Sequence, residues 1–338
     1  MGVAWAPSSE RPERNAQLHH PPIEGTCTRV VAANEEMPDS WYLQCVVIVP
    51  KMGCLNLNTL TLMKLAANLS MMYPDLPFLD RFEAAAKDGF KAVEYLFPYA
   101  FPAQELAARL KAHGLQQVLF NTPSGGTDSA SFTQAWEGGN RGTASVPGRE
   151  AEFRTGFAQA LVYAEALNCP RIHAMVGLRA AGANPEDADA TLIKNLQWAA
   201  AEAAKAGRDV LIEPINTRSV PGFHLNRQDH AHRIVQAVGA ANVKVQMDLF
   251  HCQIVEGDLS AKIAQYLPTG RVGHFQIAEV PHRHEPGTGE VNWKHVFQVI
   301  DKVSAECGWD GWIGCEYNPA DTTAGGTSRG LSWARPYL

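Results

Sequence analysis

Short apolar runs alternate with amphipathic segments along the chain from Met63 onward. This alternation is typical of repeated β/α units and predicts a parallel sheet. Eight of the runs have the length and composition of strands. They lie at 64–69, 92–95, 117–121, 171–176, 210–215, 243–249, 272–278 and 312–317. Because eight such units are enough to close a sheet on itself, we expect an α/β fold in the form of a (β/α)8 barrel.

The segments between the predicted strands have the apolar spacing of helices that cover a sheet. Several of them stop at a glycine, the residue favoured just after a helix C-terminus. These glycines are Gly89, Gly114, Gly207 and Gly308. An open, doubly wound sheet that binds a nucleotide is the alternative, but no glycine-rich phosphate loop follows any predicted strand. The closed barrel is therefore the better interpretation.

Residues 1–62 differ from the rest of the chain, with many prolines, six acidic and four basic residues, and little helical periodicity. We expect an N-terminal extension, 1–62, that is disordered or loosely packed, followed by one barrel domain, 63–338. An organellar transit peptide is poor in acidic residues, which argues against that role for the extension. The position of Met63 suggests the hypothesis that translation naturally starts there.

The composition limits the kinds of partner. The chain has 338 residues, 46% of them apolar, and a net charge of −6 without a basic run, which argues against nucleic acid as a partner. The apolar run at 41–50 is too short to span a bilayer, so no membrane partner is expected. Seven scattered cysteines without a C-x-x-C pair favour a reduced, cytoplasmic protein. A small-molecule substrate fits these limits.

Four predicted strands in the second half of the chain each end in an oxygen-bearing side chain. These side chains are Glu213, Asp248, Gln276 and Glu316. The C-terminal ends of barrel strands build the active site, and alternation along each strand lets every one of the four point inward. Carboxylate and amide oxygens are hard ligands of the kind that Mg²⁺ or Mn²⁺ prefers. A structural salt bridge is the alternative for each buried glutamate, but three carboxylates on separate strands favour a divalent metal.

Other polar residues are candidates for substrate binding. His251 follows Asp248 by three residues, and we favour a hydrogen-bonding role at the site over metal coordination. Arg283 lies in the loop after the seventh strand, where it either binds a substrate carboxylate or is a solvated loop residue. Asn121 ends the third strand and either lines the pocket or shapes a turn. His173, in the fourth strand, faces either the site or the core.

The ordered segments GFKAVEYLFPYAF, LIEPINTR, VQMDLFHCQIVEGDL, GHFQIAEVPHRHEPGTGEVN and GCEYNP run through the barrel part of the chain. In these segments the chain resembles the hydroxypyruvate isomerase family, within the xylose-isomerase-like TIM barrels. The resemblance implies a catalytic pair at Glu213 and Glu316. It also implies the same metal ligands that the strand ends indicate, with no ligand position substituted, and it says nothing about residues 1–62.

The resemblance implies an intramolecular oxidoreductase of the aldose–ketose isomerase type. It would interconvert hydroxypyruvate and 2-hydroxy-3-oxopropanoate, called tartronate semialdehyde, by proton transfer between glutamates and a metal-stabilised enediolate. Arg283 or backbone donors would hold the substrate carboxylate. Which glutamate is the base and which the acid stays open, as do the metal's identity and the formation of a homo-oligomer.

Several alternatives use the same barrel. A 2-oxo-tetronate isomerase would differ in pocket length, and a keto-sugar 3-epimerase would not need Arg283. A phosphodiesterase of the endonuclease IV type would need several histidines around zinc ions and a basic surface, which the net charge of −6 does not favour. A non-catalytic binding barrel is the weakest alternative, because all four ligand positions are intact.

Overall fold

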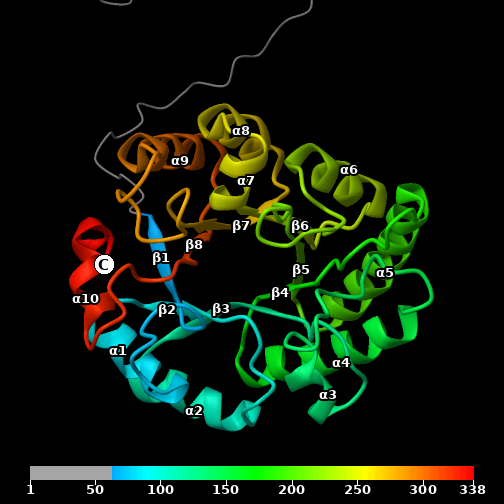
Figure 1. Cartoon of the computed structure of the whole chain (residues 1–338), viewed down its shortest axis with the longest axis horizontal. Coiled ribbons are helices and arrows are strands. Elements are labelled where there is room, and N and C mark those ends of the chain that lie inside the picture. The colour runs from blue at the N-terminus through cyan, green and yellow to red at the C-terminus, as the bar shows by residue number, and fades with distance from the viewer. Residues whose placement is uncertain (1–62) are drawn as a thin grey trace, which may run out of the picture. The chain divides into compact units, whose positions relative to one another are not determined.

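Eight parallel strands close into a barrel in the order in which they occur in the sequence, and helices surround them (Figure 1). This computed structural model describes residues 63–338, so the predicted N-terminal extension, 1–62, lies outside the described residues. The strands are β1 (Lys64–Asn68), β2 (Ala92–Glu94), β3 (Gln116–Asn121), β4 (Arg171–His173), β5 (Asp209–Ile212), β6 (Val243–Asp248), β7 (Val272–Ile277) and β8 (Trp312–Cys315). The predicted (β/α)8 barrel is confirmed.

The helices lie between the strands and after the last one. The α-helices are α1 (Arg81–Lys87), α2 (Ala103–His113), α3 (Ser129–Gln134), α4 (Glu150–Ala166), α5 (Pro185–Lys205), α6 (Gln228–Val238), α7 (Leu249–Val255), α8 (Leu259–Tyr266), α9 (Trp293–Cys307) and α10 (Gly326–Gly330). Short 3₁₀ helices are η1 (Phe78–Asp80), η2 (Leu267–Thr269), η3 (Leu331–Trp333) and η4 (Arg335–Tyr337). No helix within residues 63–338 is long and apolar enough to cross a membrane.

Local sequence signals explain where the longer helices begin and end. Pro185 occupies the first turn of α5, and the side chain of Asn184 accepts a hydrogen bond from the backbone N–H of Glu186. Helices α2 and α9 end at Gly114 and Gly308, whose φ angles of 65° and 74° lie in the left-handed region. Both helix ends agree with the predicted glycine stops.

Two of the site residues lie just beyond their strands. The predicted fifth strand extended to 215 and the eighth to 317, whereas β5 ends at Ile212 and β8 at Cys315. Glu213 and Glu316 are therefore the first residues after these strands. Strand β4 also ends earlier than predicted, at His173, and Val176 pairs antiparallel with Gly142 outside the barrel sheet.

The inside of the barrel is polar toward the C-terminal ends of the strands. The register places side by side the inward-facing pairs Asn68 and Glu94, Gln246 and His274, and Asp248 and Gln276. Strand β8 contributes Gly314 at the level of Gln276. A Cβ atom at Gly314 would lie 2.3 Å from the carboxylate oxygens of Glu94, so any other residue there would displace that carboxylate. Glycine at position 314 therefore allows the carboxylate of Glu94 to lie inside the barrel.

Candidate active site

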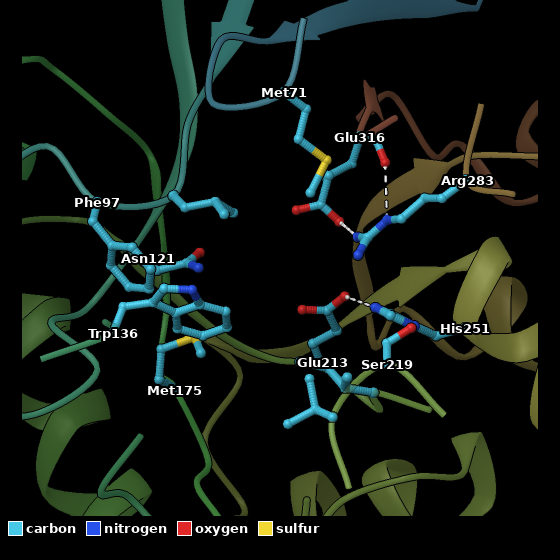
Figure 2. A pocket seen from close by; sticks show the side chains of 13 residues that line it. Met71, Phe97, Asn121, Trp136, Met175, Glu213, Ser219, His251, Arg283 and Glu316 are labelled. Carbon is cyan, nitrogen blue, oxygen red and sulfur yellow. Dashed lines mark hydrogen bonds and ion pairs between the residues drawn. The ribbon is translucent and has the colours of Figure 1, made fainter. Parts of the chain in front are cut away.

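A cavity of about 150 Å³ opens at the C-terminal ends of the strands, the end at which barrels of this type carry their sites. Its walls differ in chemistry (Figure 2). The polar wall comes from the second half of the barrel and includes Glu213, His251, Arg283 and Glu316. The apolar wall comes from the first half and includes Phe97, Trp136 and Met175, while Met71 lies beside Glu316. The cavity therefore presents charged groups to one side of a ligand and carbon surface to the other.

Three carboxylates converge with one imidazole in the polar wall. One ligand atom from each of Glu213, Asp248, His251 and Glu316 lies within 4.8 Å of the others. All four side chains are buried. Burial and the neighbouring carboxylates Glu316 and Asp248 raise the pKa of Glu213 well above its usual value. Burial is also the main cause that raises the pKa of Glu316 to about 8.

The predicted carboxylate residues are therefore together, and their geometry fits a divalent ion. Glu213 Oε1 and Asp248 Oδ2 are buried and have no hydrogen-bond partner among residues 63–338. They lie 3.7 and 3.5 Å from His251 Nε2. Buried carboxylate oxygens without partners are costly unless a cation or proton satisfies them. Three carboxylates and an imidazole are a donor set that suits a divalent metal.

His251 has the position of a ligand as well as of a hydrogen-bonding group. Asp248 ends β6 and caps α7, since its carboxylate accepts hydrogen bonds from the backbone N–H groups of Phe250 and His251. This turn brings His251 back toward the carboxylates. Its other ring nitrogen, Nδ1, contacts the side chain of Asn216, which fixes the orientation of the ring. The predicted preference for hydrogen bonding over coordination stays a prediction.

Arg283 balances part of the negative charge. Its guanidinium Nη2 lies 2.5 Å from the carboxylate of Glu316 and 3.7 Å from that of Asp248. Burial alone lowers the pKa of Arg283, but the carboxylates outweigh burial and raise it, so the side chain keeps its charge. The residue has a φ of 58°, an uncommon conformation outside glycine. Arg283 is thus part of the site rather than a solvated loop residue.

Gln276, the fourth predicted ligand, lies beside Asp248 in the register. Its side-chain nitrogen donates to Glu94 Oε1 at 2.7 Å, and its oxygen accepts a hydrogen bond from Gln246. An amide oxygen has two lone pairs, so one remains for a metal ion. The ligand role of Gln276 stays a prediction that this orientation allows.

A layer of hydrogen bonds supports the carboxylate cluster from inside the barrel. Glu94 accepts hydrogen bonds from Asn68 at 2.9 Å and Gln276 at 2.7 Å, and it lies 2.7 Å from His274 Nε2. Asn68 Nδ2 also donates to Glu316 Oε1 at 3.5 Å. Glu94 is therefore connected to the cluster through Asn68 and Gln276, and it is not a residue of the cavity wall.

Asn121 and His173 contact each other, and His173 also lies near Glu213. Asn121 lines the cavity, and its side-chain oxygen lies 3.1 Å from His173 Nδ1. The same imidazole nitrogen is 3.6 Å from Glu213 Oε2. Burial lowers the pKa of His173 to about 3, so the ring is neutral at physiological pH. His173 thus positions Glu213 and Asn121 from behind, while Asn121 faces the cavity.

The sequence patterns did not reveal the apolar wall or Asn68. Phe97 and Trp136 pack with ring centroids 5.4 Å apart, and Arg141 lies over the indole of Trp136 at 3.9 Å. Phe97 follows β2 by a few residues, a position at which a strand-end rule could have found it. Trp136 lies in an irregular segment after α3, where no periodic signal marks its direction.

The fold and the site define the class of protein. The chain belongs to the xylose isomerase-like TIM barrel family, whose model matches residues 82–337.

Within this family, the chain is 52% identical over 275 residues to the 2-oxo-tetronate isomerase of Cupriavidus necator, covering 81% of this chain and 98% of the relative. It is 42% identical to the hydroxypyruvate isomerase of Escherichia coli, covering 82% and 100%. A Brucella melitensis structure described as an AP endonuclease of family 2 is 44% identical, with a TM-score of 0.74 and 81% and 99% of the two chains covered. The predicted isomerase class and its relationship to hydroxypyruvate isomerases are confirmed.

Proposed function

We propose that the protein is a metal-dependent aldose–ketose isomerase of short 2-oxo acids, with hydroxypyruvate and 2-hydroxy-3-oxopropanoate as substrate and product. The observation that carries this proposal is the pair of buried carboxylates, Glu213 and Glu316, which face each other beside a small cavity (Figure 2). Pockets for drug-sized ligands are roughly 300–1,000 Å³, so a metabolite of a few carbon atoms suits this one better.

The site would hold Mg²⁺ or Mn²⁺ through Glu213, Asp248, Gln276 and Glu316, while His251 would form hydrogen bonds beside the ion. When bound, such an ion supplies positive charge that stabilises the anion left when a carbon atom loses its proton. Metal affinity and identity are parts of the proposal.

The two glutamates would transfer the proton between neighbouring carbons. In hydroxypyruvate, one glutamate removes a proton from C3, and the C–H electron pair forms a C2–C3 double bond as the C2 carbonyl oxygen takes up a proton. The other glutamate then gives a proton to C2, while the C3 hydroxyl loses its proton and becomes the carbonyl. The substrate is neither oxidised nor reduced overall. Two facing carboxylates in different environments suit this reaction, because one donates a proton and the other accepts one.

Arg283 would hold the substrate carboxylate. Its Nη2 and Nε atoms donate to the side chain and backbone oxygen of Glu316, while Nη1 has no protein hydrogen-bond partner among the described residues. A guanidinium with a free donor beside the cavity can bind one carboxylate oxygen of a 2-oxo acid. Asn121 lies across the cavity, where its amide can contact a substrate hydroxyl.

A second candidate substrate is 2-oxo-tetronate, which is one carbon longer. The 52% identity to a relative of that name favours it. The reaction exchanges the carbonyl and hydroxyl between C2 and C3 in the same way, so the catalytic residues need not differ. The apolar wall would then contact the extra carbon.

The test uses purified protein that has been stripped of metal with a chelator and then supplied with Mg²⁺ or Mn²⁺. Rates are compared for hydroxypyruvate, 2-oxo-tetronate and a neutral ketohexose, with Glu213→Gln as the control. Metal-dependent turnover of either acid, lost in the control, is the expected result, and the ratio of kcat/KM values assigns the substrate. A folded protein that binds metal but turns over neither acid would overturn the proposal, and turnover of only the ketohexose would assign an epimerase. A cytoplasmic location and a homo-oligomer remain predictions.

A further inference from the structure

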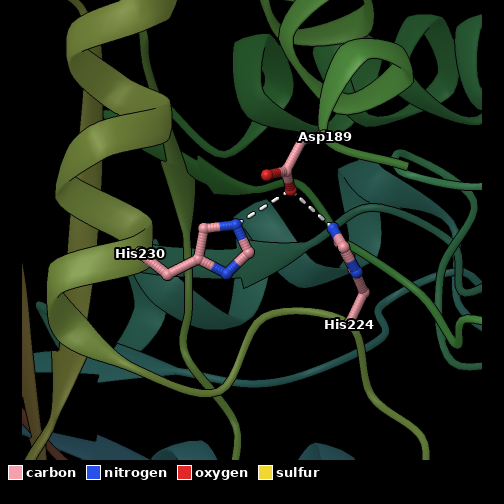
Figure 3. A group of neighbouring side chains, drawn as sticks. All are labelled: Asp189, His224 and His230. Atoms are coloured by element: carbon pink, nitrogen blue, oxygen red, sulfur yellow. Dashed lines mark hydrogen bonds and ion pairs between the residues drawn. The ribbon is translucent and has the colours of Figure 1, made fainter. Parts of the chain in front are cut away.

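A second group of metal-ligating side chains lies outside the cavity, where two helices and a loop meet (Figure 3). Asp189 comes from the first turns of α5, and His230 from the first turn of α6. His224 comes from the loop that joins β5 to α6. None of these residues lines the cavity or touches the carboxylate cluster.

The two imidazoles converge on one oxygen atom. His224 Nε2 lies 2.7 Å, and His230 Nε2 2.8 Å, from Asp189 Oδ1. The two rings are nearly perpendicular, with an interplanar angle of 83°, so their nitrogens approach that oxygen from different directions. One ligand atom of each residue lies within 4.8 Å of the others. The three donor atoms thus lie close enough together to bind one ion.

We propose that Asp189, His224 and His230 form a second metal site, selective for a borderline transition-metal ion such as Zn²⁺. Two imidazole nitrogens and one carboxylate oxygen are a donor set that suits Zn²⁺, Co²⁺ or Ni²⁺ better than Mg²⁺. The carboxylate-rich cluster at the cavity has the opposite preference. The two sites would therefore differ in the ions they bind.

The arrangement is more specific than two ordinary hydrogen bonds require. A carboxylate has two oxygens, and two imidazoles that were merely held in place could each use one of them. Here both use Oδ1. A tetrahedral zinc ion with ligands at about 2.0–2.1 Å sets its ligand atoms roughly 3.3 Å apart. The present contacts would widen by about half an ångström, which rotation of the partly exposed side chains of Asp189 and His230 provides.

The three side chains differ in their exposure to solvent, so one is held rigidly and the other two are accessible to an ion. The side chain of His224 is 1% exposed, whereas those of His230 and Asp189 are 19% and 33% exposed. The buried imidazole fixes one ligand in place, and the other two face solvent. A water molecule would complete the coordination from that side, as it does at zinc sites with three protein ligands.

The site would also clamp a loop that reaches the cavity. The segment from Glu213 to His224 contains Ser219 and Val220, which line the cavity wall. An ion bound by the three side chains would join this segment to α5 and α6. Because a ligand that binds only the folded state stabilises it, Zn²⁺ would raise the thermal stability of the protein.

The test counts Zn²⁺ ions bound per full-length chain after dialysis, and it uses no substrate. Its outcome is therefore independent of the proposed isomerase activity. The wild type should retain one more equivalent of Zn²⁺ than His230→Ala or Asp189→Asn. His295→Ala, which removes an exposed histidine on α9, should retain the wild-type number. Both changes at the site affect partly exposed side chains, so we expect these variants to fold.

Two further measurements identify the ligands of the bound ion and its effect on thermal stability. Cu²⁺ bound at the site should show nitrogen hyperfine coupling from two imidazoles by electron paramagnetic resonance, and one set of couplings should disappear in His230→Ala. In excess Mg²⁺, added Zn²⁺ should raise the Tm of the wild type and of His295→Ala but not that of Asp189→Asn. Equal Zn²⁺ stoichiometry in the wild type and both site variants would overturn the proposal.

Discussion

The cavity wall built by the second half of the barrel differs in kind from the wall built by the first half (Figure 2). The second half places charged groups directly at strand ends, as with Glu213, Asp248 and Glu316. The first half instead lines the cavity with carbon from the loops, as with Phe97 and Trp136. Under the proposed function, the residues of the second half would carry out the chemistry, and the apolar residues of the first half would select the substrate.

Burying the polar wall also costs more free energy of folding than burying the apolar wall. Burying a carboxylate costs several kcal/mol unless a cation or hydrogen bonds compensate it. Arg283 and the hydrogen-bonded layer around Glu94 supply part of that compensation. The apolar wall needs no such support, because burying carbon surface stabilises the fold by about 25 cal/mol per Å². Substitutions in the two walls should therefore have different signatures.

The largest effect should follow from Glu213→Gln or Glu316→Gln. Under the proposed function, each change removes a proton-transfer group and weakens a metal ligand, so kcat should fall at least about 1,000-fold. Steady-state rates with saturating Mg²⁺ or Mn²⁺ measure this, and circular dichroism checks the fold. A variant that kept a tenth of the wild-type kcat would show that the residue is not catalytic.

Arg283→Ala should have the next largest effect. Without the guanidinium, the metal-free cluster loses its cation, and the free energy of unfolding should fall by about 3–5 kcal/mol. Added divalent metal should restore much of this loss, because the ion replaces the missing charge. Urea unfolding with and without metal measures both quantities. The matched variant Arg283→Lys keeps the charge and should lose less stability, and equal losses in both would contradict a charge-balancing role.

Glu94→Gln tests the support beneath the polar wall. The substitution keeps the shape but places an amide where hydrogen bonds from Asn68 and Gln276 converge. Changes to groups that orient metal ligands typically cost 10–100-fold in metal affinity or activity, and we expect a loss in that range. Isothermal titration with Mn²⁺ measures the affinity. Unchanged affinity together with unchanged kcat would mean that Glu94 serves the fold alone.

Trp136→Ala should give the smallest effect, and one of a different kind. The change widens the apolar wall without touching the carboxylates, so kcat should stay within about threefold while KM for hydroxypyruvate rises about tenfold. The ratio of kcat/KM values should shift toward longer 2-oxo acids, because the enlarged cavity accommodates another carbon. A fall in kcat with no change in KM would instead show that Trp136 takes part in the chemical step.

The architecture could be predicted because its signals are repetitive. Every strand was visible as an apolar run, and glycines such as Gly114 and Gly308 marked helix ends. The ends of the strands were harder to predict, because the local sequence does not show which residues pair with distant segments outside the sheet. Val176 continues an apolar run and yet pairs with the distant Gly142.

The carboxylates of the site could be predicted for the same reason, since Glu213, Asp248 and Glu316 lie at or directly after the end of an apolar strand. Alternation stops where a strand turns into a helix, so the direction of His251 did not follow from its spacing. Asn68 was missed because the first strand was expected to run on to residue 69, whereas β1 ends at Asn68. Trp136 was missed because it lies in a loop without the regular spacing of apolar residues that marks a helix or strand.

Pairing between β1 and β8 has a consequence for how the protein is made. Lys64 lies opposite Trp312, so the ring closes only when the last strand meets the first. Ribosomes add roughly 5–20 residues per second, and during that time β1 and β7 present open edges that could pair with another nascent chain. Glu316 follows β8 directly and is the last of the proposed ligands to be synthesised. The moment at which enzyme activity appears during translation would thus show when the barrel closes.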